Sequence, residues 1–341
     1  MRTITGRTFA FRFALVLLCT SAQTIAQDDN EVMDEVITIG TRSADRSVQE
    51  SPVPVDIIDA AELRRSPNIA GELGGLLQSA VPSFSMPRQS NSDQTDIVRS
   101  AQLRGLSPDQ VLVLVNGKRR HSNAVISTES KVGRGSAAVD FNNIPTSAIE
   151  RIEVLRDGAA AQYGSDAIAG VINIVLKDKA DGGDATVSYG AHVTDLDPVD
   201  AEITDGQTLT VSVNHGLTLA NGFINLSAEY RDRSATNRSG FDQLPTIGFG
   251  EFIVPIPSSG TPDAAPNDAL AGQRNYGLGD GESRDINLMF NAGFDLDSGF
   301  QLYSFGSYSD RDGEGYNFFR YPVSANNAIS VHPQGFLPLG N

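Results

Sequence analysis

The sequence predicts an α+β domain followed by antiparallel β-strands of an incomplete transmembrane β-barrel. The α+β prediction comes from residues 149–177, where a charged strand, a helical turn, a glycine-rich bend and an apolar strand follow one another. The barrel prediction comes from residues 184–341, where apolar and polar side chains alternate in five segments of outer-membrane strand length. Long and short connections also alternate between these segments, which favours a barrel over a water-soluble sandwich.

Length and composition narrow the class of protein. The chain has 341 residues, enough for two domains, and a formal net charge of −16. A chain this acidic is not expected to bind nucleic acid or an anionic membrane surface through its charge. It has no Walker loop, HExxH, GxSxG or CxxC pattern, and its four histidines lack metal-ligand spacing. The sequence therefore predicts no enzyme, no metal site and no cofactor.

The first 26 residues have the features of a secretory signal peptide. Arg2 and Arg7 precede an apolar run, and small residues lead to a cleavage site expected before Gln27. The single cysteine, Cys19, lies inside this segment. The mature protein is therefore expected to have no thiol and no disulfide.

A flexible, acidic and polar leader is predicted over residues 27–49. Within it, only a short stretch centred on Val36–Ile39 has strand composition. An isolated strand cannot satisfy its own backbone hydrogen-bonding groups. We therefore expect this stretch either to fold back on the chain or to be captured by the sheet edge of a partner.

The α+β domain is predicted over residues 50–177. It begins with an edge strand at residues 52–58, because an edge position tolerates the prolines at its start. Asp59 and Glu62 then form a capping-box pattern that begins a short helix.

The remaining elements of this domain follow in order. A second helix is expected from Ser66-Pro67 to Ala80, and an apolar strand at residues 111–115 ends in the hairpin signal Asn116-Gly117. The last four elements are a charged strand, a helical turn, a glycine-rich bend and an apolar strand, at residues 149–156, 157–163, 164–170 and 171–176. The apolar strand does not alternate, so it is expected to be buried on both faces.

A glycine-rich hinge at residues 178–184 precedes the alternating part of the chain. The five alternating segments lie at residues 184–192, 207–219, 224–231, 286–295 and 300–311. The connections at 193–206 and 233–283 are long, whereas those at 220–222 and 297–299 are minimal. This pattern predicts short turns at one end of the sheet and long loops at the other, with apolar side chains outward and polar ones inward.

Two stretches resemble the plug domain of TonB-dependent outer-membrane receptors. Residues 149–156 are similar to the I-E-R-I-E-V-x-R strand near the end of such a plug, and Tyr163-Gly164 opens a Y-G-x-x-A-x-x-G-x-I-N-I run. Residues 112–119 resemble the family's V-L-I-D-G-x-R segment, with Asn116 where aspartate is commoner. The resemblance implies a mixed α/β plug inside a barrel, in the outer membrane of a Gram-negative cell and surrounded by its lipid.

The resemblance also implies that the chain is the N-terminal part of a larger receptor. A plugged receptor barrel has about 22 strands, and five are predicted here. An open five-stranded sheet would leave an unpaired edge facing lipid, which a bilayer does not permit. We therefore expect the chain to be an N-terminal fragment or a truncated reading frame of such a receptor, which would not insert as a working pore by itself.

The same resemblance places partner contacts on the leader and on the charged strand. The leader is similar to a TonB box, which pairs with the periplasmic TonB protein by strand addition, here through Val36, Ile37, Thr38 and Ile39. The charged strand is the candidate for docking the plug on the barrel wall, through Glu150, Arg151, Glu153 and Arg156. The alternative for these four charges is pairing within the plug sheet.

Loop residues of the predicted plug are candidates for ligand contact at its apex. They are Arg88, Gln89, Asn91, Arg120 and His121. Arginine suits ferric siderophores because these ligands are often anionic. Each of the five is also a residue type that is common in solvated loops.

The function implied by the resemblance is energised uptake of a scarce ligand, in most such receptors a ferric siderophore. Two alternatives remain at this stage. The first is a receptor for an oligosaccharide or cobalamin, and the second is a stand-alone plug-like binding module that does not transport.

Overall fold

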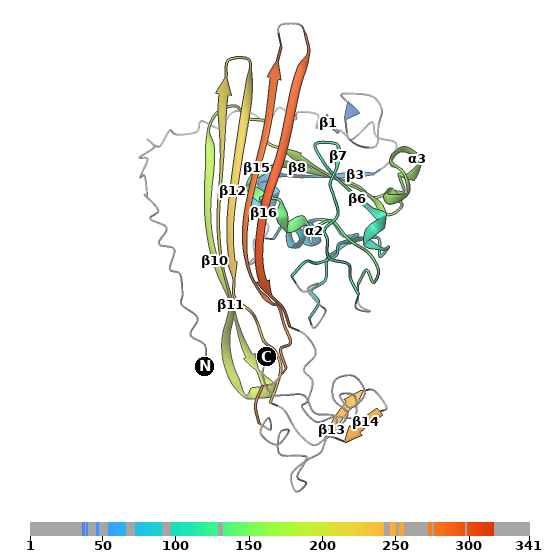
Figure 1. The fold of residues 1–341 in the computed structure, drawn as a ribbon, viewed down its shortest axis with the longest axis vertical. Helices are drawn as coiled ribbons and strands as arrows, with labels where there is room; N and C mark the ends of the chain where they lie inside the picture. Colours follow the sequence, from blue (N-terminus) through green and yellow to red (C-terminus); the bar gives the residue numbers. More distant parts are fainter. Residues whose placement is uncertain are drawn as a thin grey trace, which may run out of the picture. The chain divides into compact units, whose positions relative to one another are not determined.

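A five-stranded mixed sheet forms the centre of the N-terminal domain (Figure 1). Its strands lie in the order β3-β8-β9-β6-β7. They are β3 (Val55–Asp59), β6 (Val111–Val115), β7 (Lys118–Arg119), β8 (Ile149–Leu155) and β9 (Gly170–Leu176). β6 and β9 are parallel, and the other pairs in this sheet are antiparallel. The predictions of an edge position for the first strand and burial of the last on both faces are confirmed.

The structure is a computed structural model, and it describes part of the chain. The described residues are 36–37, 39, 46–47, 54–65, 72–90, 97–128, 132–241, 246–249, 252–255, 272–274, 276–296 and 299–316. The predicted signal peptide lies outside these residues.

Short helices connect the strands of the N-terminal domain. α1 (Ala60–Arg65) begins as predicted, because the Glu62 amide donates to Asp59 Oδ1 at 2.6 Å. α2 (Leu73–Ala80) begins later than predicted, since Glu72 before it has an extended backbone; residues 66–71 lie outside the described part. α3 (Ala160–Tyr163) is the predicted single helical turn after β8. Single 3-10 turns lie at Pro108–Gln110, Phe141–Asn143, Thr146–Ala148 and Ser165–Ala167.

Two turns of this domain depend on backbone conformations that few side chains allow. Asn116 and Gly117 both have positive φ, 47° and 73°, as the β6–β7 hairpin requires. Gly170 has a φ of 145°, and a Cβ there would collide with the carbonyl oxygen of Leu155 on β8. Glycine at this position therefore lets β9 begin directly beside β8.

Apolar clusters cover both faces of the sheet. On one face, α2 packs through Leu73, Leu76 and Leu77 against alternate residues of the strands. The other face is a smaller cluster that includes Val55, Leu112, Leu114, Leu155 and Val171. Because successive residues of a strand point to opposite faces, β6 contributes to both clusters.

The leader folds back on the chain. β1 (Val36–Ile37) pairs antiparallel with β2 (Arg46–Ser47). Two residues after β1, the Ile39 side chain is 1% exposed and belongs to the smaller apolar cluster of the N-terminal domain. The leader is thus attached to the domain at this residue.

A second sheet, the long sheet, consists of five antiparallel strands in the order β10-β11-β12-β15-β16 (Figure 1). They are β10 (Gly183–Leu196), β11 (Ala201–Leu219), β12 (Gly222–Arg233), β15 (Glu282–Asp295) and β16 (Gln301–Glu314). The small hairpin of β13 (Thr246–Phe249) and β14 (Phe252–Pro255) lies in the predicted long connection between β12 and β15.

One predicted loop is wrong. Residues 193–206 continue β10 and β11 as a paired hairpin, and only a 3-10 turn at Asp197–Val199 and Asp200 separates the two strands. A register shift between Gly190 and His192 interrupts the alternation there, so the acidic, polar sequence resembles a loop.

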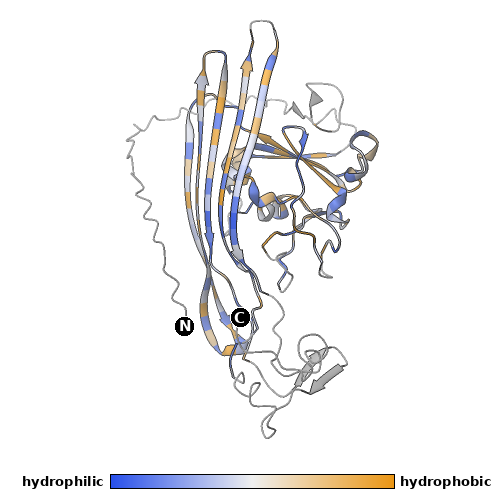
Figure 2. Cartoon of the chain, viewed as in Figure 1, coloured by the Kyte–Doolittle hydropathy of each residue, from blue (hydrophilic) through white to orange (hydrophobic). Residues whose placement is uncertain are grey.

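Hydrophilic and hydrophobic residues alternate along the strands of the long sheet (Figure 2). The two faces of the sheet therefore have opposite polarity, as predicted. Apolar side chains on one face are exposed, such as Val187 (71%), Leu226 (45%) and Leu288 (45%). The buried side chains of the other face are mainly polar or charged, such as Arg231 (2%) and Asn287 (1%). Among the described residues, no helix has the length and apolar composition needed to cross a membrane.

Candidate functional site

The polar face of the long sheet is buried against the N-terminal domain, and we call this contact the polar junction. The domain contributes Glu72, Arg88, Arg99, Asp140, Asn142 and Thr146. The sheet and the segment just before β15 contribute Glu229, Arg231, Arg233, Asp280, Asp285, Asn287 and Arg311. Charges held away from water need such partners, because an unpaired buried charge is costly.

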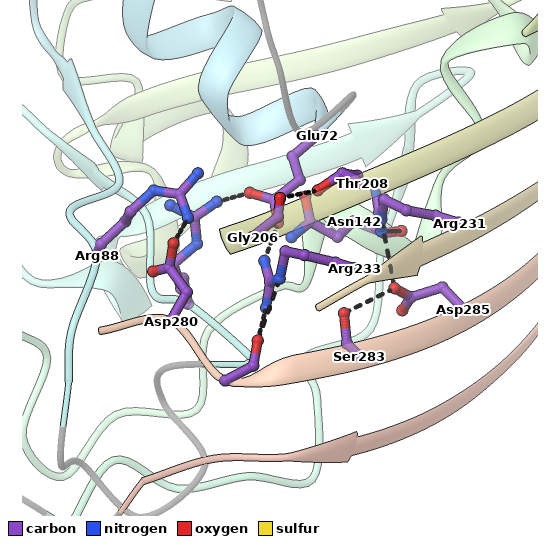
Figure 3. Close-up of polar contacts among 12 residues, drawn as sticks. Glu72, Arg88, Asn142, Gly206, Thr208, Arg231, Arg233, Asp280, Ser283 and Asp285 are labelled. Atoms are coloured by element: carbon purple, nitrogen blue, oxygen red, sulfur yellow. Dashed lines mark hydrogen bonds and ion pairs between the residues drawn. The ribbon is translucent and has the colours of Figure 1, made fainter. Parts of the chain in front are cut away.

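Arg231 of β12 is buried in the junction, beside Asn142 and Asp285 (Figure 3). Its Nε donates to Asp285 Oδ2 at 3.3 Å, and its Nη2 donates to the backbone carbonyl of Asn142 at 3.3 Å. Asp285 also accepts a hydrogen bond from Arg311, whose Nη1 donates to Asp140 Oδ2 at 2.6 Å. Charges from β12, β15, β16 and the N-terminal domain therefore form one connected set.

A second set of charges, the Glu72 cluster, comprises Glu72, Arg88, Arg99, Arg233 and Asp280. The Glu72 carboxylate accepts from Arg99 of its own domain and, at 2.6 Å, from Arg233 Nη1 of β12. Arg233 also donates to the carbonyl of Gly281 at 3.0 and 3.2 Å. Burial, with the nearby Arg233 guanidinium, lowers the pKa of Arg99 to about 10, so Arg99 keeps its charge at neutral pH.

Uncharged groups complete the junction around Glu229. The backbone amide and hydroxyl of Thr146 donate to Glu229 Oε2 at 3.2 and 3.3 Å. Asn287 Nδ2 donates to the Asn142 carbonyl at 3.0 Å, beside the bond from Arg231. The 3-10 turns of the N-terminal domain thus present backbone groups to the sheet.

The half of the sheet nearer the short turns makes weaker and more apolar contacts with the domain. Asn116 Nδ2 donates to Asn291 Oδ1 at 3.2 Å, and Lys118 lies 5.8 Å from the centre of the Tyr303 ring. Met289 of β15 is buried in the larger apolar cluster of the domain. The contact is therefore mainly ionic toward the long-loop end and mixed toward the short-turn end.

The polar junction can hold the N-terminal domain against the long sheet and still release it. An ionic contact loses its partners when the surfaces separate, and water can then solvate the charges. An apolar contact has no such compensation. Among the described residues, no group of three or more His, Cys, Asp or Glu side chains is placed to hold a metal ion.

The four charges proposed for docking have partners within the N-terminal domain and the hinge. Arg151 pairs with Glu153 at 3.0 Å, and Glu153, fully buried, also accepts from Asn173 at 3.2 Å. Arg156 pairs with Asp56 at 2.6 Å on the neighbouring strand. Glu150 lies 4.0 Å from Lys179. Docking of these charges on further strands of a barrel stays a prediction.

The five candidate ligand residues do not gather at one place. Arg88 pairs with Asp280, and buried Gln89 accepts from the Val132 amide at 3.1 Å, whereas Asn91 lies outside the described residues. Arg120 donates to Ser307 Oγ on β16 at 2.8 Å. On β16, Ser307 lies seven residues from Glu314, which corresponds to roughly 23 Å along the strand. Glu314 pairs with Glu282, and Glu282 is two residues from Asp280, the partner of Arg88.

His121 is exposed, next to Arg120. Partial burial of its ring and the Arg120 guanidinium lower the pKa of His121. Burial likewise lowers the pKa of Arg120. These two residues therefore form a site separate from Arg88 and Gln89.

The predicted TonB box is partly described. Val36–Ile37 form β1 and Ile39 is buried, while Thr38 lies outside the described residues.

The sequence analysis missed the residues of the polar junction other than Arg88. One signal was present: Glu229, Arg231 and Arg233 occupy successive inward positions of β12. Three charges on the buried face of one strand require partners from the domain that packs against this face. Nothing in the sequence, however, identifies Glu72 or Asn142 as those partners.

Comparison with known proteins follows the same division of the chain. Residues 47–171 match the family model of the TonB-dependent Receptor Plug Domain. The chain therefore contains the plug domain of TonB-dependent receptors. Its N-terminal domain is the plug domain, and its long sheet corresponds to the start of the receptor barrel, which confirms the predicted fold class.

Relatives of this chain include proteins named for ferric enterobactin and for vitamin B12. It is 26% identical over 294 residues to the ferric enterobactin receptor PirA of Pseudomonas aeruginosa, covering 82% of this chain and 37% of the relative. It is 33% identical over 140 residues to the ferrienterobactin receptor of Escherichia coli, covering 41% and 18%. It is 46% identical over 88 residues to the vitamin B12 transporter BtuB of Vibrio cholerae, covering 26% and 13%. The chain thus spans well under half of these proteins.

A solved structure shows the same fold. The ferric enterobactin receptor PfeA of Pseudomonas aeruginosa, in a mutant form, superposes with a TM-score of 0.55 at 20% identity, covering 83% of this chain and 36% of that one. The relatives named above are receptors and a transporter, not enzymes.

Proposed function

We propose that the protein containing this chain is a TonB-dependent outer-membrane receptor for the energised uptake of a ferric siderophore. The observation that carries the proposal is the plug domain held by buried charges on the polar face of a sheet whose other face exposes Leu, Val and Phe side chains. Such a sheet suits a wall with lipid outside and a plug inside. The relatives named for ferric enterobactin support the siderophore class.

In this proposal, the first 26 residues direct export and are then removed, and the leader reaches the periplasm. The TonB protein pairs with the leader at Val36, Ile37, Thr38 and Ile39 by strand addition. Because β1 already pairs with β2 along one edge, TonB either uses the other edge or displaces β2. A pull on the leader then moves part of the plug away from the wall.

The docking proposal for Glu150, Arg151, Glu153 and Arg156 concerns the part of the wall beyond β16. Charge reversal, Arg151→Glu, in the complete receptor is expected to weaken retention of the plug and to reduce uptake. Because Arg151 also pairs with Glu153 inside the plug, Arg119→Glu provides a control that disrupts a different pair of the plug, with Asp166, and is not among the docking charges. Equal effects of both changes would assign the charges to plug stability rather than docking.

We further propose that Arg88, Gln89, Asn91, Arg120 and His121 contact ligand at successive depths rather than in one pocket. Arg88 lies near the long-loop end, whereas Arg120 reaches the middle of β16. Replacing Arg88 by Ala should then weaken initial binding, whereas replacing Arg120 should slow transport after binding. Equal effects on both steps from either change would contradict this order.

Uptake of radiolabelled iron as ferric enterobactin tests the function. A strain lacking the gene should lose uptake under iron limitation and regain it with the intact gene. A gene carrying Ile37→Pro should not restore uptake, because proline cannot donate in an added strand. Normal uptake by the deletion strain would contradict the proposal.

Vitamin B12 is the second candidate ligand, favoured by the 46% identity to BtuB over 88 residues. That match covers 13% of BtuB, so it supports the ligand class less than the longer match to PirA. Cyanocobalamin-dependent growth of the same deletion strain distinguishes the two ligands.

A further inference from the structure

The Glu72 cluster carries an excess of positive charge in an otherwise acidic chain. Three arginines, Arg88, Arg99 and Arg233, face the two carboxylates of Glu72 and Asp280. The formal net charge of the whole chain is −16. An anion that approaches the long-loop end of the plug therefore meets a local attraction at this cluster.

Only one of the three arginines is accessible. The side chains of Arg99 and Arg233 are 5% and 6% exposed, whereas that of Arg88 is 43% exposed. Arg88 is paired with Asp280, a residue that belongs to the segment before β15 rather than to the plug (Figure 3). The accessible cation of the Glu72 cluster is thus occupied by a carboxylate from outside the plug.

Asp280 is held in place mainly from its own side. Its backbone amide donates to Thr236 Oγ1 at 2.9 Å, and its carbonyl accepts from the Thr236 amide at 3.0 Å. Across to the plug, the Gly279 amide donates to Ser90 Oγ at 2.8 Å, beside the Arg88–Asp280 ion pair. Because Arg88 is 43% exposed, water screens its side of the ion pair and a solute can reach the guanidinium.

We propose that Asp280 is a built-in competitor for an anionic ligand, whose carboxylate occupies Arg88 until an anionic group of the ligand takes its place. The exchange leaves Arg88 paired and releases Asp280 to water, so the segment 276–281 loses its ionic tie to the plug. Arg99 and Arg233 stay bound to Glu72 and keep the plug on the wall. This proposal rests on the proposed uptake of an anionic ferric siderophore.

The test uses the complete receptor in detergent, with ferric enterobactin as the anionic probe. Asp280→Asn keeps the shape of the side chain but removes the competing charge. It should tighten binding by about twofold to fivefold, the factor that an exposed ion pair is worth. It should also speed hydrogen exchange at residues 276–281 without ligand. Asp280→Ser should act in the same direction.

The matched control is Asp166→Asn. Asp166 pairs with Arg119 elsewhere on the plug, and both side chains are about half exposed. This change should alter neither ferric enterobactin binding nor exchange at residues 276–281. Arg88→Gln should speed exchange there as Asp280→Asn does, but should weaken binding instead of tightening it.

Two results would overturn the proposal in distinguishable ways. If the wild-type receptor binds ferric enterobactin and Asp280→Asn binds it no more tightly than Asp166→Asn, Asp280 is not a competitor and the uptake function stands. If the wild-type receptor binds no ferric enterobactin but binds cyanocobalamin, which has no net charge, the siderophore function fails and the competitor proposal fails with it.

Discussion

The plug domain and the long sheet distribute apolar and charged side chains in opposite ways. In the plug, Ile172 and Ile174 of β9 are fully buried between two apolar layers. In the long sheet, Leu288 of β15 is 45% exposed, whereas Asp285 on the other face of the same strand is 1% exposed. Both regions are β-sheets, so the difference lies in what covers each face.

The comparison shows that the two regions depend on each other and on their surroundings. The plug supplies its own apolar cover through α2 and the second cluster. Among the described residues, no apolar layer covers the outward face of the long sheet, and its inward charges are satisfied by groups of the plug such as Asn142 and Asp140. A family located in the outer membrane can expose the apolar face to lipid.

The largest expected effect comes from leaving the inward charges unpaired. Arg231→Met should lower the free energy of unfolding by roughly 3–5 kcal/mol, because it leaves Glu229 and Asp285 buried without this partner. Arg119→Met, at an exposed pair with Asp166, should cost only about 0–1 kcal/mol. Urea unfolding of the receptor in lipid vesicles measures both. Similar small losses would mean that water reaches the polar junction.

A substitution in the plug tests the contribution of its buried apolar side chains. Leu77→Ala, at a fully buried position of α2, should cost about 2–5 kcal/mol because it leaves a cavity. Ile126→Ala, at a side chain 59% exposed, should change stability by only about 0.5 kcal/mol. The same urea titration, followed by a probe in the plug, measures both. A small loss for Leu77→Ala would show that the plug is held mainly by the wall.

A third test concerns the apolar, outward face of the long sheet. Leu288→Arg should cost roughly 2–4 kcal/mol in a bilayer, because it places a charge among lipid chains. Glu282→Arg, on the same face of β15 beyond the apolar residues, should cost only about 0–1 kcal/mol. The yield of folded receptor in vesicles reports the difference. Equal tolerance of both changes would exclude lipid as the cover of this face.

The smallest expected effect concerns His121, an exposed residue of the plug. Because partial burial and Arg120 lower the pKa of His121, its titration should have a midpoint below the ordinary value of about 6.5. As pH falls below that value the unfolded chain gains the proton first, so the native state loses a little stability. Arg120→Ala should raise the pKa of His121 only partly, since burial is the larger cause. Histidine-selective modification over a pH series, read by mass spectrometry, gives the midpoint.

Local elements of the fold could be predicted from the sequence because their causes are local. The capping bond from Glu62 to Asp59, the Asn116-Gly117 turn and the alternation of β12 each depend on residues a few positions apart. The 193–206 hairpin escaped prediction because a register shift between Gly190 and His192 interrupts the alternation at its base.

The polar junction could not be predicted because its partners are distant in the chain. Glu72 and Arg233 are 161 positions apart, and neither has a neighbouring residue that indicates the other. The sequence showed charges in both regions, but pairing depends on how the plug is oriented within the wall. The charges of β8 could be recognised in the sequence because they lie close together on one strand. Several of them pair within that strand or with the adjacent strand.

The packing of Ile39 in the smaller apolar cluster has a mechanical consequence. This side chain lies among Leu112 and Leu114 of β6 and Leu155 of β8, the two strands that flank the central β9 of the plug sheet. Tension applied upstream of residue 39 would therefore act on this apolar cluster, which joins β3, β6, β8 and β9, as well as along the chain through β2. A pull on the leader would thus be transmitted into several strands of the plug sheet at once through the packing of one apolar side chain.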